Sequence, residues 1–130
     1  MIVLADHNVE GQAILLWGTL ATEGWLDVLP LRLITFSAVG LPNESNDRVV
    51  WRFAQARRMV LLTGNRRMRG PDSLEQTIRE ENTPTSLPVL TVANVQRLDG
   101  RVYRERCSSR LVEVLLEIDN YLGTGRLFIP

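Results

Sequence analysis

Two short apolar runs, each ending on polar residues, stand out in the hydrophobic pattern of the chain. Residues 1–8 read Met-Ile-Val-Leu-Ala-Asp-His-Asn, and residues 59–63 repeat the arrangement as Met-Val-Leu-Leu-Thr. Continuous apolar runs of this length predict strands buried on both faces, as in a parallel sheet. Further strands are predicted at residues 29–36 and 87–92. Residues 126–130 either add a short edge strand or pack as a tail.

Between these runs, apolar residues recur at three- and four-residue steps, which predicts helices. The expected helices, including one short helical turn, cover residues 9–24, 47–58, 73–81, 94–98 and 102–122. Strands that alternate with helices predict an α/β fold with three layers, α/β/α, around a four- to five-stranded, mainly parallel sheet. A length of 130 residues suits a single domain, 1–130.

Polar residues in front of three of these helices are suited to cap them. Asn8 precedes the first helix, and Ser45 or Asn46 precedes the second. Ser73 is followed three residues later by Gln76, the spacing of a capping box.

Polar side chains also fall at one rim of the predicted sheet. Asp6 follows the first strand, Asn65 follows the third, and Asp47 begins the helix that leads into the third strand. Because strand ends and the helix starts after them share a rim of a parallel sheet, we expect these three residues to converge. Asp72 lies a few residues beyond, and Asn8 neighbours the site. Carboxylate and amide oxygens suit hard cations, so the rim predicts a site for Mg²⁺ or Mn²⁺.

The loop over residues 64–72 carries Arg66, Arg67 and Arg69 between glycines and a proline. Guanidinium groups bind phosphate in a planar, two-pronged manner, so these arginines are candidates to hold the backbone of an RNA strand. A metal and arginines on one rim indicate metal-dependent phosphodiester hydrolysis. All 15 basic residues are arginine, but 15 acidic residues balance them, which is not the profile of a strongly cationic nucleic-acid binder.

The sequence lacks the motifs of several other classes of binding and catalytic site. The chain has no glycine-rich dinucleotide motif, no lysine-containing phosphate loop and no serine nucleophile elbow. The single histidine, His7, is expected to be a packed or solvent-facing neighbour of the site, and the single cysteine, Cys107, a buried structural thiol. No apolar stretch is long enough to span a bilayer, and the first residues lack the pattern of a secretory signal. We therefore expect a cytoplasmic protein without membrane association.

Three segments of the chain resemble the PIN-like proteins. They are Val-Leu-Ala-Asp-His-Asn-Val at residues 3–9, Asn-Asp-Arg-Val-Val-Trp-Arg-Phe-Ala-Gln-Ala at 46–56 and Met-Val-Leu-Leu-Thr-Gly-Asn-Arg at 59–66. The resemblance covers about the first half of the chain and is to the small stand-alone bacterial group, whose members often occur as toxin-like or uncharacterised proteins. It implies a parallel sheet between helices, with acidic residues that bind Mg²⁺ or Mn²⁺ for ribonuclease activity.

Matched to this family, Asp6 takes the first acidic position and Asp47 the second. Asn65 stands where the family has its third aspartate, so Asp6, Asp47 and Asn65 form the implied catalytic set. An asparagine keeps a carbonyl oxygen for a metal but brings no charge, which weakens Mg²⁺ binding. Asp72 or Glu75 are candidates to compensate for the missing carboxylate.

The resemblance supports two functions. The first is a metal-dependent ribonuclease acting on single-stranded RNA, with the toxin of a toxin–antitoxin pair as one setting and an antitoxin-like protein as partner. The alternative is a catalytically degenerate PIN-like domain that binds RNA or a protein. Without the resemblance, an unrelated small-molecule site on the same rim remains open. A homodimer is the expected state for a small domain of this kind.

Overall fold

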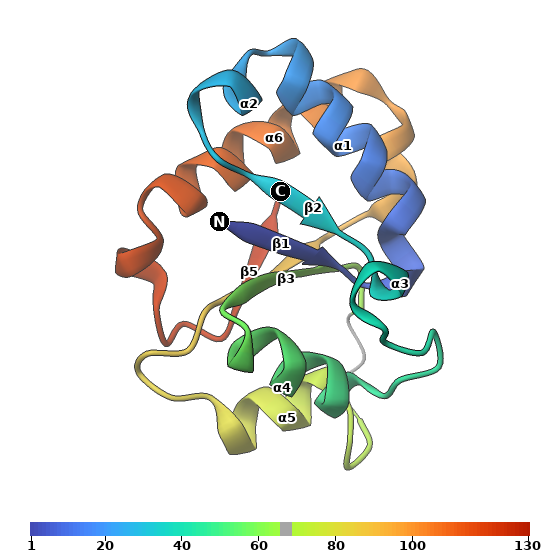
Figure 1. The fold of residues 1–130 in the computed structure, drawn as a ribbon, viewed down its shortest axis with the longest axis vertical. Helices are drawn as coiled ribbons and strands as arrows, with labels where there is room; N and C mark the ends of the chain where they lie inside the picture. Colours follow the sequence, from blue (N-terminus) through green and yellow to red (C-terminus); the bar gives the residue numbers. More distant parts are fainter. Residues whose placement is uncertain (66–68) are drawn as a thin grey trace.

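Five parallel strands form one sheet at the centre of the fold, which a computed structural model describes over residues 1–65 and 69–130 (Figure 1). The strands are β1 (Ile2–Ala5), β2 (Arg32–Ile34), β3 (Met59–Thr63), β4 (Val89–Val92) and β5 (Arg126–Ile129). Their order across the sheet is β2-β1-β3-β4-β5, and each neighbouring pair is parallel. The predicted α/β fold is confirmed, and the last residues form an edge strand.

Helices cover both faces of the sheet, with α1, α2 and α6 on one face and α4 and α5 on the other (Figure 1). The α-helices are α1 (Glu10–Thr22), α2 (Trp25–Val28), α3 (Phe36–Val39), α4 (Asp47–Ala56), α5 (Leu74–Glu81) and α6 (Arg101–Leu116). Short 3₁₀ turns are η1 (His7–Val9), η2 (Val95–Asp99) and η3 (Ile118–Tyr121). Of the helices that the structure describes, none is long and apolar enough to cross a bilayer.

The strands β1 and β3 are buried on both faces, as their continuous apolar sequences predict. Val3 and Val60 pack into the cluster beneath α1 and α6, where the Cys107 thiol is also fully buried. Leu4 and Leu61 pack on the opposite face, in the cluster that includes residues of α4 and α5. Alternate residues of one strand therefore supply two cores, which excludes a solvent-facing side for either strand.

Two predicted elements near the start of the chain are shorter than expected. Of the helix predicted over 9–24, Val9 belongs to η1 and residues 10–22 form α1, and Gly24 follows that helix in a left-handed conformation with φ of 83°. A separate short helix, α2, begins at Trp25. Asn8 lies inside η1 and does not cap α1. The strand predicted over 29–36 pairs only at Arg32–Ile34, and Phe36 already begins α3.

The last helix also differs from its prediction. α6 ends at Leu116, and Glu117 leaves the helical conformation before η3 begins. Ile118 and Leu122 nevertheless pack against the same core cluster as α6, so the apolar pattern continues across the break and conceals it. By contrast, the predicted caps of α4 and α5 are confirmed, since Asn46 and Ser73 accept hydrogen bonds from the amides three residues on.

The strand order creates a switch point beside β1. The chain goes from β1 to β2 on one side and then returns across β1 to β3 on the other. In open α/β sheets, ligands bind outside the carboxyl ends of the strands at such a point. The residues that follow β1 and β3 therefore lie where a site is expected.

Candidate functional site

Asp6 extends β1 by one residue and is held by the end of β3. Its backbone amide donates to the carbonyl of Leu62 at 2.8 Å, and its Oδ2 accepts a hydrogen bond of 2.7 Å from the Thr63 hydroxyl. Thr63 is fully buried, and its Oγ1 accepts in turn from the backbone amide of Asn65 at 2.9 Å. A single hydroxyl thus fixes the Asp6 carboxylate relative to the loop that follows β3.

Asp47, the first residue of α4, accepts two hydrogen bonds on one carboxylate oxygen. Asn65 donates through Nδ2 to Asp47 Oδ2 at 2.8 Å, and the backbone amide of Leu74 donates to the same oxygen at 3.1 Å. Leu74 begins α5, so the Asp47 carboxylate also lies at the positive end of that helix. Asp47 and Asn65 therefore contact each other directly, as predicted. Asp6 is linked to them through Thr63, which donates to Asp6 and accepts from the Asn65 amide.

The two carboxylates interact electrostatically. Burial raises the pKa of Asp6, the hydrogen bond from Thr63 opposes that rise, and the negative charge of Asp47 adds to it. Within residues 1–65 and 69–130, neither aspartate forms an ion pair with an arginine or with His7. His7 itself is a partly exposed neighbour whose Nδ1 lies 3.7 Å from Glu10. The described part of the rim thus holds two nearby negative charges that no arginine or histidine of that part pairs with.

A cavity of about 400 Å³ opens between the ends of β1, β3 and β4. Its lining consists of Asn8, Val9, Asp47, Gly64, Asn65, Val95 and Gln96. Asn8 therefore neighbours the site, as predicted, although it caps no helix. The wall at residue 64 is tightly packed, because a Cβ atom added to Gly64 would lie 2.3 Å from Cγ2 of Val95.

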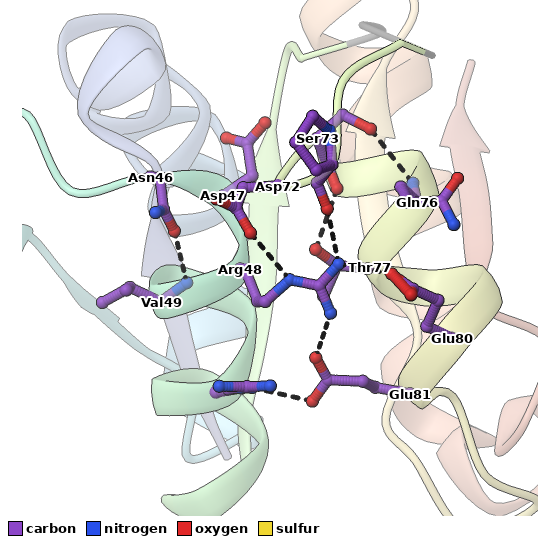
Figure 2. Close-up of polar contacts among 12 residues, drawn as sticks. Asn46, Asp47, Arg48, Val49, Asp72, Ser73, Gln76, Thr77, Glu80 and Glu81 are labelled. Atoms are coloured by element: carbon purple, nitrogen blue, oxygen red, sulfur yellow. Dashed lines mark hydrogen bonds and ion pairs between the residues drawn. The ribbon is translucent and has the colours of Figure 1, made fainter.

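Asp72 lies in the loop before α5 and is paired with a cation. Its Oδ1 lies 3.0 Å from Nε of Arg48. The same guanidinium pairs with Glu80, at 2.6 Å between Nη2 and Oε1, and with Glu81 (Figure 2). Figure 2 shows the Arg48 side chain extending from α4 toward α5, between these carboxylates. Asp72 makes no hydrogen bond with Asp6, Asp47 or Asn65 in the described part of the chain. Its charge serves the contact between α4 and α5.

The predicted RNA-binding loop is described only in part. Arg66 and Arg67 lie outside the described residues. Arg69 borders a surface depression of about 380 Å³ that Asp47 and Asn46 also line. Arg69 and Asp47 therefore line the same depression.

Three further residues hold the site and were not singled out from the sequence. The sequence predicts Thr63 as the last residue of a strand, and a polar residue at that position indicates a contact at the rim. Gly64 is predicted only as part of the loop after that strand. Arg126, from β5, donates to the carbonyl of Asn65 at 2.7 Å, and no local pattern links two residues so far apart in the sequence.

Groups of three or more His, Cys, Asp or Glu side chains suited to a metal ion are absent from the described residues. The donor set is instead two carboxylates and one carboxamide. Comparison of the chain with protein-family models, curated proteins and solved structures gives no match. The resemblance to PIN-like proteins therefore stays a prediction that rests on the three short segments.

Proposed function

We propose that the rim carrying Asp6, Asp47 and Asn65 binds Mg²⁺ or Mn²⁺ and hydrolyses phosphodiester bonds of single-stranded RNA. The observation that carries this proposal is the pair of aspartates at the β1/β3 switch point. Burial and the charge of Asp47 raise the pKa of Asp6, and the described residues supply no ion-paired cation. Like charges held close together at a partly buried site cost free energy, and carboxyl groups perturbed in this way are enriched at functional sites.

The donor chemistry fits a hard cation. Mg²⁺ is commonly held by one or two carboxylates together with water and substrate phosphates, so Asp6 and Asp47 are sufficient protein ligands. When bound, the cation supplies Lewis acidity toward a phosphodiester and its attacking water. Thr63 orients the Asp6 carboxylate and Asn65 orients that of Asp47.

The neighbouring surface suits a phosphate-bearing strand, and the resemblance to PIN-like proteins is the reason for proposing RNA. Arg69 borders the same depression as Asp47, and a guanidinium there is suited to a phosphate of a bound strand. A cytoplasmic location, self-association as a dimer and an antitoxin-like partner belong to this proposal as its biological setting.

One observation favours a second function. The Asn65 amide donates to Asp47 Oδ2, so a neutral donor already satisfies the oxygen that a cation would otherwise attract. In this alternative the domain is catalytically degenerate and binds RNA or a protein partner without cleaving it.

A cleavage assay distinguishes the two. A fluorescent single-stranded RNA is incubated with wild type, Asp6→Asn, Asp47→Asn and a control, Asp119→Asn, which alters an exposed carboxylate in η3. With millimolar Mn²⁺ we expect cleavage by wild type and the control, abolished by EDTA and reduced about a hundredfold or more in both site variants. Cleavage that survives EDTA or both site substitutions contradicts the proposal, and binding of RNA without cleavage supports the second function.

A further inference from the structure

Arg126 places a largely buried guanidinium next to the loop that carries Asn65. Its side chain is 11% exposed, although β5 is an edge strand. Nη1 donates to the carbonyl oxygen of Asn65 at 2.7 Å and to Oγ1 of Thr91 at 2.8 Å. Nη2 lies 3.4 Å from Oε2 of Glu75. The guanidinium therefore joins the loop after β3, the strand β4 and the first turn of α5.

The contacts of Arg126 are linked to the Asp47 carboxylate through two different segments of the chain. Arg126 holds the main chain of Asn65, whose side chain donates to Asp47 Oδ2. Arg126 also pairs with Glu75, which directly follows Leu74, and the Leu74 amide donates to the same Asp47 oxygen. Both hydrogen bonds to Asp47 thus come from segments that Arg126 contacts. A planar, forked guanidinium reaches several acceptors at fixed angles, which an ammonium group cannot do.

We propose that Arg126 is a positioning residue of this site, which holds Asn65 and Glu75 so that the Asp47 carboxylate keeps the orientation needed for a divalent cation. The inference rests on the proposed function. Arg126 forms no hydrogen bond or ion pair with Asp6 or Asp47 among the described contacts, so it acts through Asn65 and the start of α5. The edge strand β5 thereby contributes to a rim formed mainly by β1 and β3.

The test separates positioning from a purely structural role. Arg126→Met and Arg126→Lys are compared with Arg110→Met, which removes another partly buried arginine that pairs with Glu113 and contacts Tyr121. Mn²⁺ affinity is measured by calorimetry below the Tm of every variant. We expect the Kd to rise about 10- to 100-fold in Arg126→Met, to recover partly in Arg126→Lys and to stay unchanged in Arg110→Met. An unchanged Kd in Arg126→Met, with only a lower Tm, overturns the inference.

A second readout needs no metal. In the wild type, we expect slow solvent exchange in NMR spectra for the Asn65 Nδ2 proton that donates a hydrogen bond to Asp47. Exchange should accelerate in Arg126→Met and not in Arg110→Met. If wild type binds no Mn²⁺ but this exchange still depends on Arg126, the metal site fails and the positioning role stands. If exchange is the same in all variants, the positioning role fails.

Discussion

The side-chain amide of Asn65 donates a hydrogen bond of 2.8 Å to Oδ2 of Asp47. This contact joins the loop after β3 to the first residue of α4, across the switch point of the sheet. It also gives the rim a neutral donor at a position where the PIN-like resemblance implies a third carboxylate. The balance between metal binding and stability should therefore depend on residue 65.

Asn65→Asp is expected to lower the free energy of unfolding of the metal-free protein and to raise its affinity for Mn²⁺. Without metal, Asp47 loses a hydrogen-bond donor and gains a negative neighbour, which should lower the free energy of unfolding by about 1–3 kcal/mol. With saturating Mn²⁺ the loss should be reversed, since a third carboxylate binds the cation more tightly. Urea denaturation in EDTA and in Mn²⁺ measures both effects. A loss of stability that Mn²⁺ does not reverse would contradict the proposed metal site.

Asp6→Asn is expected to stabilise the protein at neutral pH. Burial and the charge of Asp47 raise the pKa of Asp6 in the folded state above its ordinary value of 3.8. The folded protein therefore holds the Asp6 proton more tightly than the unfolded chain does, and stability falls as the pH rises from about 3.8 through the raised pKa. An asparagine avoids this loss and still offers an oxygen to the Thr63 hydroxyl.

The pH dependence of Tm checks this expectation. The Tm of Asp6→Asn should exceed that of wild type at pH 7, and the difference should disappear as the pH falls below the ordinary pKa of aspartate. Asp119→Asn, at an exposed position, serves as the control and should show no such difference. A Tm for Asp6→Asn below that of wild type at pH 7 would mean that the Asp6 charge stabilises the fold.

Gly64→Ala should destabilise the wall of the cavity. The added methyl group would lie 2.3 Å from Cγ2 of Val95 and 3.2 Å from Cγ1 of Val9. Overpacking of this kind costs about 1–3 kcal/mol. Truncating the neighbour in Gly64→Ala/Val95→Ala should cost less than the sum of the single changes, because the clash is removed.

Gly18→Ala is the matched control for that substitution. A methyl group at residue 18 meets no atom within 4 Å, and Gly18 lies within α1. Alanine is favoured over glycine in a helix by about 1 kcal/mol, so this change should stabilise the protein. Thermal denaturation of both variants tests the prediction, and equal effects of the two substitutions would contradict the tight packing at residue 64.

The sequence predicts the parts of the site that depend on topology. Asp6, Asp47 and Asn65 could be brought together in advance because the apolar runs of β1 and β3 imply parallel strands with a shared rim. The same topology places Thr63 and Gly64 at this rim, since they are the last residue of β3 and the residue after it. What the pattern misses is side-chain direction, and it therefore gives no indication that Thr63 binds Asp6.

Contacts between distant elements could not be predicted in this way. The pairing of Asp72 with Arg48 depends on how α4 packs against α5, and the contact of Arg126 with Asn65 depends on the register of β5 beside β4. Neither contact produces a periodic pattern of apolar residues in the sequence. The break at Glu117 has a local cause, because the apolar pattern continues into Ile118 and Leu122 and so predicts one continuous helix.

Titration of the protein with Mn²⁺, followed by NMR, tests the central claim most directly. If Asp6 and Asp47 hold a divalent cation, the amide signals of residues 6, 47 and 65 should broaden first and saturably. The Asp6→Asn/Asp47→Asn variant should lose this effect while keeping its fold. Broadening that persists in the double variant, or that is confined to the carboxylates around Arg48, would contradict a metal site at the β1/β3 switch point.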